Sequence, residues 1–211
     1  MDKVQKFLSK LSTTNTPENL FNPFNEVCEI HDLPNAPQIR LENVKTLLNK
    51  HLELGTKTVW LFEAPSYLGA RRSGAPFVNE GMFEEVQSIL GIEKSFQKAT
   101  KTESATAMTS KMAWKVANEF GLKPLIWESL MFHPHKKGEP MTNRKPSKQE
   151  MMEYKHFLTD LLDMIKPERM IAVGRVAEQG LALMDIKAEY VRHPAQGGYR
   201  EFRKKMRELY I

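Results

Sequence analysis

The sequence predicts an α/β protein: a three-layer αβα sandwich with a central, mostly parallel sheet of four strands. Four short apolar runs are typical of buried strands, and segments with apolar residues at helical spacing lie between them. Strands that alternate with helices pair in parallel, and the helices then cover both faces of the sheet. The predicted strands lie at about residues 57–62, 124–127, 169–173 and 187–191. We find no internal repeat and expect one domain over residues 1–211.

The first 55 residues are expected to form a helical and irregular wrap around an α/β core of residues 56–211. Apolar residues at helical spacing predict a short amphipathic helix over residues 1–14. Four prolines and several asparagines between Thr16 and Gln38 then indicate irregular structure. A second helix is predicted after this stretch, and Gly55 is placed to end it before the first strand.

Helices are predicted between the strands and after the last one. Two helices, near residues 80–90 and 104–120, separate the first two strands, and a glycine follows each of them. The capping box Ser147-Lys-Gln-Glu150 predicts the start of the helix before the third strand. A further helix is expected from Gly174 to about Met184. The chain closes with a basic amphipathic helix after Gly197-Gly198.

The composition excludes some classes of site. Cys28 is the only cysteine, so an intramolecular disulfide and a four-thiolate zinc or iron–sulfur site are excluded. The amino-terminal residues lack the apolar core of a secretory signal. No segment approaches the ~20 apolar residues of a membrane span. We therefore expect a soluble, cytoplasmic protein, and a monomer.

The distribution of charge favours a polyanionic partner more than the total does. The net charge is +5 and the pI is about 9.2, which alone is a weak signal. The last twenty residues carry six Lys or Arg against two acidic residues, which a solvated helix face explains as well as DNA does. Smaller basic clusters at residues 71–72, 136–137 and 144–145 each lie in a loop after a predicted strand, and this position favours nucleic acid.

Three chemically rich loops are predicted to meet at one edge of the sheet. The first strand runs into Glu63-Ala64-Pro65, where proline stops it and leaves a carboxylate at its carboxyl end. The loops over residues 63–77, 128–146 and 192–200 each follow a predicted strand. Because parallel strands have their carboxyl ends at the same edge, where ligands bind in open α/β sheets, one shared site is expected.

Four motifs lie in or beside these loops. They are Phe62-Glu63-Ala64-Pro65 with Ser73-Gly74-Ala75-Pro76-Phe77, Phe132-His133-Pro134-His135 through Asn143-Arg144-x-Pro146, Ala172-Val-Gly-Arg175-x-Ala177-Glu178, and His193-Pro194-Ala-Gln-Gly-Gly198. In this order they resemble the motifs of the uracil-DNA glycosylase superfamily. The resemblance is to the branch whose first motif is Gly-Glu-Ala-Pro-Gly with a later Gly-x-Pro-Phe, and it covers roughly residues 57–205.

The resemblance implies a DNA glycosylase that flips a pyrimidine out of the helix and hydrolyses its N-glycosidic bond without a metal or organic cofactor. Phe77 is then the platform on which the base stacks, with Phe62 beside it. A donor from His193 would stabilise the negative charge that develops on O2 of the leaving base. Glu63 would orient or deprotonate the attacking water, or act electrostatically on the developing positive charge at the sugar.

Departures from the family pattern leave two substrates open. The family's base-reading Asn falls on Glu128, and a carboxylate cannot donate a hydrogen bond to O4 of uracil. It can accept one from the N4 amino group of cytosine, and a protonated Glu could also donate to N3. Some branches have a bulky residue at the position of Ser66, and the small serine leaves room for a 5-substituent on the base. Other branches have Asp or Asn at the position of Ala64, so the exact role of Glu63 stays open. A 5-modified cytosine, as in some phage DNA, and uracil are both candidates, in a repair or a defence role.

DNA contacts are expected around the site. Phosphate contacts, which give affinity without sequence choice, are predicted for Arg71, Arg72, Lys136, Lys137, Arg144 and Arg200. Gln196 and Tyr199 are candidates for the wedge that fills the vacated stack. No metal is expected, because His133 and His135 have no third ligand at suitable spacing.

The sequence also leaves two other functions open. One is a noncatalytic DNA-binding relative, and the other is a hydrolase of free nucleosides or nucleotides, for which the basic loops would be superfluous. The geometric expectation is shared by the glycosylase proposals. Glu63, Phe77, Glu128 and His193 should surround one cavity large enough for a pyrimidine, beneath a positively charged surface.

Overall fold

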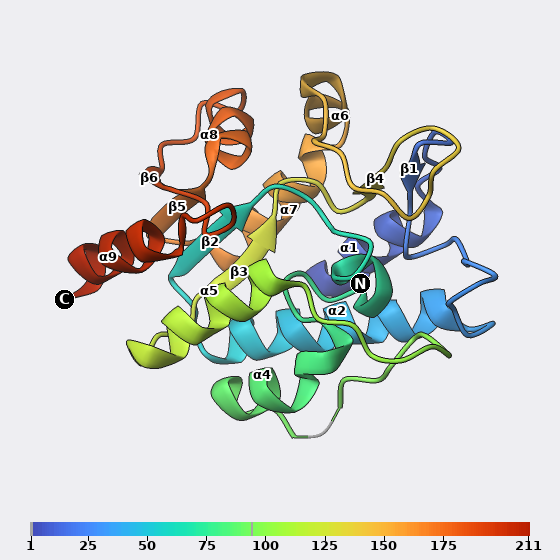
Figure 1. Ribbon diagram of the computed structural model, residues 1–211, viewed down its shortest axis with the longest axis horizontal. Helices are drawn as coiled ribbons and strands as arrows, with labels where there is room; N and C mark the ends of the chain where they lie inside the picture. Colours follow the sequence, from blue (N-terminus) through green and yellow to red (C-terminus); the bar gives the residue numbers. More distant parts are fainter. Residues whose placement is uncertain (1, 94) are drawn as a thin grey trace.

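The computed structural model, which describes residues 2–93 and 95–211, is an αβα sandwich around a four-stranded sheet (Figure 1). The strand order is β3-β2-β5-β6, and each neighbouring pair is parallel. The predicted fold class is therefore confirmed, with a sheet that is entirely parallel. The strands are β2 (Thr58–Phe62), β3 (Leu125–Glu128), β5 (Arg169–Val173) and β6 (Glu189–Val191).

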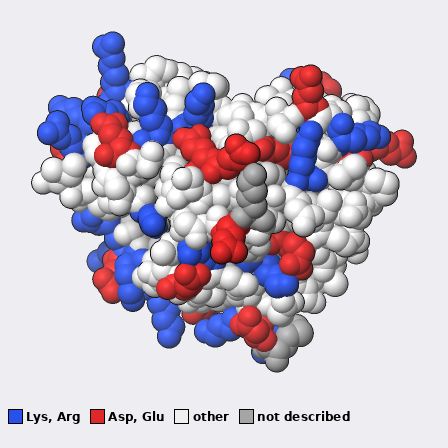
Figure 2. Space-filling view, turned by 90° about the horizontal axis from the view of Figure 1, so that it is seen from below, with Lys and Arg blue, Asp and Glu red and all other residues white. Residues whose placement is uncertain are grey.

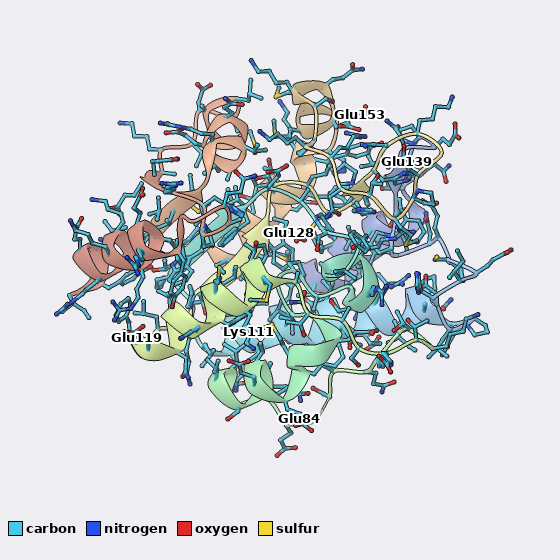
Figure 3. All side chains as sticks on the ribbon, viewed as in Figure 1. Glu84, Lys111, Glu119, Glu128, Glu139 and Glu153 are labelled. Carbon is cyan, nitrogen blue, oxygen red and sulfur yellow. The ribbon has the colours of Figure 1, made fainter. Side chains whose placement is uncertain are left out.

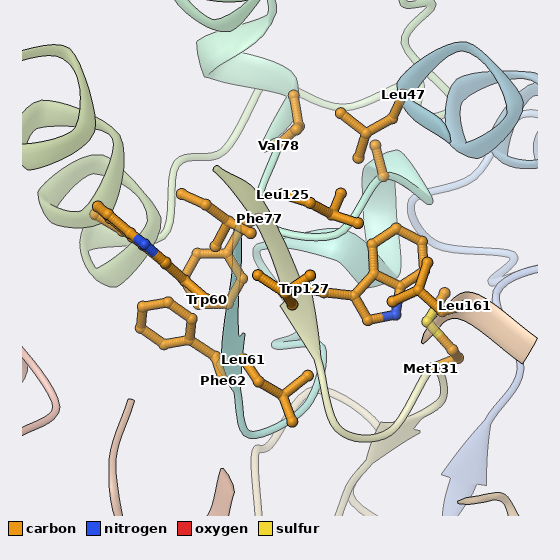
Figure 4. Close-up of a cluster of buried hydrophobic side chains, with 14 of the residues drawn as sticks. Leu47, Trp60, Leu61, Phe62, Phe77, Val78, Leu125, Trp127, Met131 and Leu161 are labelled. Atoms are coloured by element: carbon orange, nitrogen blue, oxygen red, sulfur yellow. The ribbon is translucent and has the colours of Figure 1, made fainter. Parts of the chain in front are cut away.

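Both faces of the sheet are buried, which explains why β2 is a continuous apolar run. On one face, Trp60 packs edge-on against Phe202 of α9 (Tyr199–Tyr210), with ring centroids 6.1 Å apart. On the other face, Trp127 packs against Phe7 of α1 (Lys3–Thr13) at 6.2 Å. Figure 4 shows Phe62 and Phe77 to one side of these strands and Trp127 to the other.

The remaining helices complete the layers and the amino-terminal wrap. Helix α5 joins the face that α9 covers, and α7 packs against α1 on the opposite face. Their bounds, with the other helices, are α2 (Ala36–Glu53), α3 (Ala70–Ser73), η1 (Glu80–Met82), α4 (Phe83–Leu90), α5 (Met108–Glu119), α6 (Lys148–Glu153), α7 (Lys155–Ile165) and α8 (Arg175–Ala182). Among the described helices, none is both long and apolar enough to cross a membrane.

Several boundaries differ from the sequence expectation. Helix α2 begins at Ala36, inside the stretch expected to be irregular, because Pro37 is tolerated in a first helical turn. The Ser147–Glu150 capping box is present in both directions, but the helix that it opens breaks at Tyr154 into α6 and α7. A two-residue strand, β1 (Leu20–Phe21), pairs with β4 (His133–Pro134) and ties the wrap to the long loop after β3.

Candidate active site

The largest cavity described here lies at the carboxyl edge of the sheet, where the sequence predicted a site. Its volume is about 460 Å³, and we call it the aromatic cavity. The loops after β2 and β6, the long loop after β3 and the start of α5 all contribute to its wall. Its lining includes Phe62, Glu63, Ser66, Phe77, Met108, Asn143 and His193.

Two aromatic rings form one wall of the aromatic cavity. Phe62 ends β2 and Phe77 returns from the following loop, so that their ring centroids lie 4.0 Å apart with 36° between the planes. Phe77 has φ +57°, a conformation that costs energy for a bulky side chain. The indole of Trp114 donates to the Phe77 carbonyl at 2.9 Å, which helps to hold that backbone. Such strain at a cavity wall indicates a fixed aromatic surface.

The hydrogen bonding of His193 defines which ring nitrogen carries the proton. The backbone N–H of Ala195 donates to Nδ1 at 3.2 Å, so in the neutral ring the proton is on Nε2. Burial lowers the pKa of His193, which favours this neutral form. The ring stands edge-on to Phe62 at 5.8 Å. His193 is thus an N–H donor at the cavity wall.

A glycine makes room for this imidazole. Gly174, at the end of β5, has φ +90°, and a Cβ there would lie 3.2 Å from the Cβ of His193. A side chain at position 174 would therefore both strain the backbone and crowd the histidine.

Glu63 lies between the aromatic cavity and a second one. This second cavity, of about 360 Å³, shares Glu63 and His193 with the first. Burial raises the pKa of Glu63, and the nearby Lys145 ammonium opposes that shift. Lys145, Arg175 and Arg192 also line the second cavity, so we call it the basic cavity. Of these three cations, the sequence analysis named none as a contact residue.

Glu128 does not occupy its predicted place. The parallel register puts it opposite Phe62, and residues in register point to the same side of a sheet, so it faces the layer that holds the aromatic cavity. Glu128 is only 3% exposed, however, and it is not among the residues that line the cavity. The Glu128 side chain is labelled in Figure 3. Its Oε2 is buried without a hydrogen-bond partner in the described structure, and burial raises the pKa of the carboxyl well above its usual range.

The prediction that Arg71 and Arg72 contact DNA phosphates is contradicted by their burial. Both lie in the buried α3, at 4% and 8% exposure. The Arg71 guanidinium stacks on Phe21 at 4.1 Å and donates to the Pro140 carbonyl, because the strand pair β1–β4 and the long loop fold over it. Arg72 donates to the Tyr67 carbonyl at 3.2 Å. These two arginines hold loops together and cannot reach a phosphate from the interior.

Of the other residues predicted to contact DNA, two are bonded or packed within the protein and four are exposed. Arg144 pairs with Glu150 and donates to three backbone carbonyls, so its guanidinium is committed within the protein. Tyr199 is partly buried, with Lys115 lying 6.0 Å from its ring centroid, and does not project as a wedge would. Exposed positions are found for Lys136, Lys137, Gln196 and Arg200.

Asn143 is a cavity residue that the sequence analysis did not single out for a role. Its Oδ1 accepts from the backbone N–H of Tyr67 at 2.9 Å and lies 3.1 Å from Nε2 of His133. Burial lowers the pKa of His133 to about 3, and Arg71 can only donate to its Nδ1, so the Nε2–H donates to Asn143. This chain of bonds fixes the two loops that form one rim of the aromatic cavity. The Asn143-Arg144-x-Pro146 motif was the available signal.

The two neighbouring histidines, His133 and His135, do not form part of a metal site in the described residues. His133 and His135 stack on each other with centroids 5.6 Å apart. Across residues 2–93 and 95–211, no three His, Cys, Asp or Glu side chains gather as metal ligands would.

No family model matches the sequence, and no curated protein matches it either. The two cavities are therefore the features that bear on function.

Proposed function

We propose that this protein is a DNA glycosylase that flips out a pyrimidine and hydrolyses its N-glycosidic bond, leaving an abasic site. The observation that carries the proposal is the aromatic cavity, where Phe77, Glu63 and His193 line the same space. At about 460 Å³ it lies within the range of about 300–1,000 Å³ that is usual for small-ligand pockets. A base inside a duplex is inaccessible, so such chemistry requires extrusion into a cavity of this kind.

His193 acts on the base side of the bond that breaks, and Glu63 acts on the sugar side. As C1′–N1 opens, its electron pair stays on the base, and the neutral His193 donates from Nε2 to the O2 that gains charge. Glu63 positions the water whose oxygen adds to C1′ and accepts its proton. Phe77 and Phe62 provide the stacking surface that replaces neighbouring bases.

Cations beside the aromatic cavity support a nucleic-acid substrate. Lys145, Arg175 and Arg192 line the basic cavity, which meets the aromatic cavity at Glu63 and His193. Phosphates next to an extruded nucleotide would lie there and contribute affinity without sequence choice. Figure 2 shows further Lys and Arg side chains gathered at the end of the molecule where Figure 1 places α9, whose exposed cations include Arg200 and Lys204.

The base is proposed to be a 5-modified cytosine or uracil. Ser66 lines the cavity with a small side chain, which leaves room beside C5 of a pyrimidine. Glu128 favoured cytosine in the sequence analysis, but it does not line the cavity, so its carboxyl would have to move to contact the base. The two substrates are therefore distinguished by assay.

Base release from matched oligonucleotides tests the proposal. Duplex and single-stranded DNA bearing uracil or 5-hydroxymethylcytosine should develop alkali-labile sites when incubated with the protein. Glu63→Gln and His193→Ala should each lower the rate at least about a hundredfold, since each group acts in the transition state. Glu84→Gln, an exposed carboxylate on α4 away from the cavity, is the matched control and should leave the rate unchanged.

Three outcomes would contradict the glycosylase proposal or its substrate. DNA binding without alkali-labile sites on either base would indicate a noncatalytic DNA-binding protein. Release from free nucleosides with none from DNA would indicate a small-molecule hydrolase. Robust uracil release without activity on the modified cytosine would end the cytosine hypothesis and leave a uracil-excision enzyme.

A further inference from the structure

Met108 is an exposed apolar side chain at the wall of the aromatic cavity. It is the first residue of α5 and is 61% exposed. Within the described part of the chain, other large apolar side chains are also exposed, but Met108 alone among them lines this cavity. The others are Val27, Ile30, Leu52, Leu54, Met152 and Ile211.

The packing of α5 does not account for this exposure. The buried residues of the helix are Ser110, Ala113, Trp114, Val116 and Ala117, and Met108 is not among them. Trp114 also donates to the Phe77 carbonyl at 2.9 Å, which fixes the helix to the aromatic wall of the cavity. Met108 is therefore an apolar side chain in solvent, held on a helix whose position relative to the Phe77 backbone is set.

We propose that Met108 is the wedge that enters the DNA stack and fills the space left by the extruded base. This inference rests on the proposed glycosylase function. Extruding a base costs a few kcal/mol of stacking, and proteins that distort DNA insert apolar side chains such as Met between base steps to offset that cost. An unbranched thioether adapts to an irregular gap.

The surroundings of Met108 are compatible with a nearby DNA backbone. The first turn of α5 contains no acidic residue, and its amino-terminal N–H groups have no side-chain cap. Lys111 follows one turn later. Negatively charged phosphates are therefore not repelled by the start of this helix.

Met108 fits the wedge better than the two residues that the sequence suggested. Tyr199 is partly buried and packed against the core. Gln196 is exposed, but it lines the basic cavity rather than the aromatic one, and its side chain is polar. Met108 alone of the three is both apolar and in the wall of the aromatic cavity.

Comparing duplex with single-stranded DNA tests the wedge. A single strand has no opposing strand to hold the stack closed, so a wedge matters mainly in duplex. Met108→Ala should lower base release from duplex about tenfold or more, the effect of losing part of a few kcal/mol of stacking compensation, while release from a single strand stays within about twofold. Met152→Ala, which removes an exposed Met on α6 outside the cavity, should change neither rate.

A second readout separates extrusion from hydrolysis. With 2-aminopurine beside the target base, wild-type protein should raise the fluorescence of the duplex, and Met108→Ala should abolish most of that rise. If wild type releases no base from any substrate but gives this Met108-dependent signal, hydrolysis fails while the wedge stands. The wedge is overturned if fluorescence does not rise with wild type, if Met108→Ala keeps full duplex activity, or if it lowers release from both kinds of DNA equally.

Discussion

The basic side chains fall into two groups with opposite environments. Arg40, Arg71 and Arg72 are enclosed in the protein interior, whereas Arg175 and Arg192 are exposed at the basic cavity. Local sequence does not separate Arg71 and Arg72 from Arg175 and Arg192, since all four follow predicted strands. The difference teaches that burial, and not position in a loop, decides whether a cation serves the fold or a partner.

The enclosed group depends on internal acceptors. Arg40 is fully buried and pairs with the buried Asp32, and it also donates to the Arg72 and Pro23 carbonyls. Burial lowers the pKa of Arg40, and Asp32 opposes that shift. A buried cation without these partners would be costly, so the group specifies how the surrounding loops pack.

The largest expected effect comes from breaking the enclosed ion pair. Arg40→Met leaves the Asp32 carboxylate buried without its partner and should lower the free energy of unfolding by about 3–5 kcal/mol. Urea denaturation at neutral pH measures this. Arg200→Met, at an exposed position on α9, should change stability by no more than about 0.5 kcal/mol.

A double variant identifies the cause. Adding Asp32→Asn to Arg40→Met removes the stranded charge and should restore part of the lost stability. Equal stability of Arg40→Met and Arg200→Met would show that a buried arginine and an exposed one contribute alike to the fold.

A smaller effect is expected from acid, because His133 belongs to the enclosed region and is neutral in the folded state. The pKa of His133 is about 3 in the folded protein, against 6.5 for an ordinary histidine in the unfolded chain. Below pH 6.5 the unfolded chain binds a proton that the folded chain does not, so stability falls with falling pH until about 3. The loss is about 1.4 kcal/mol per pH unit.

Unfolding measured between pH 7 and 5 checks this sign. His133→Gln should make the pH dependence shallower, whereas His156→Gln, at an exposed position on α7, should leave the contribution of His133 in place. An unchanged slope in His133→Gln would mean that another group causes the acid sensitivity.

The smallest change in stability is expected for variants of the exposed group, which should instead change DNA binding. Arg192→Gln should weaken DNA binding and reduce the slope of log K against log salt by about one if that guanidinium meets a phosphate. Its stability should stay within about 0.5 kcal/mol of wild type, because the Arg192–Glu201 pair is exposed. Binding titrations at several salt concentrations measure the slope.

Lys57→Gln provides the matched control, since Lys57 is exposed at the opposite, amino-terminal edge of the sheet. It should not alter the slope. Equal slopes for Arg192→Gln and wild type would mean that Arg192 in the basic cavity does not contact a DNA phosphate.

The candidate site was partly predictable from sequence. Glu63, Phe77 and His193 line one cavity as expected, because each follows or returns to the carboxyl end of a parallel strand. Glu128 ends β3 as its apolar run suggested, but whether the last side chain of a strand reaches a cavity depends on its neighbours in space. Met108 was missed because it follows no predicted strand, whereas Asn143 was noted only within its motif because no local pattern records its bond to the Tyr67 N–H.

By itself, the sequence determined the αβα fold, the edge of the sheet that carries the candidate site and five of the residues that line its cavity, which are Phe62, Glu63, Ser66, Phe77 and His193. These follow from periodicity and from proline and glycine stops, which act over a few residues. Only the tertiary structure decided that Arg71 and Arg72 are interior, that Glu128 is enclosed and that Met108 is exposed at a cavity wall. Burial and hydrogen-bond partners come from segments far apart in the chain, so no local pattern records them.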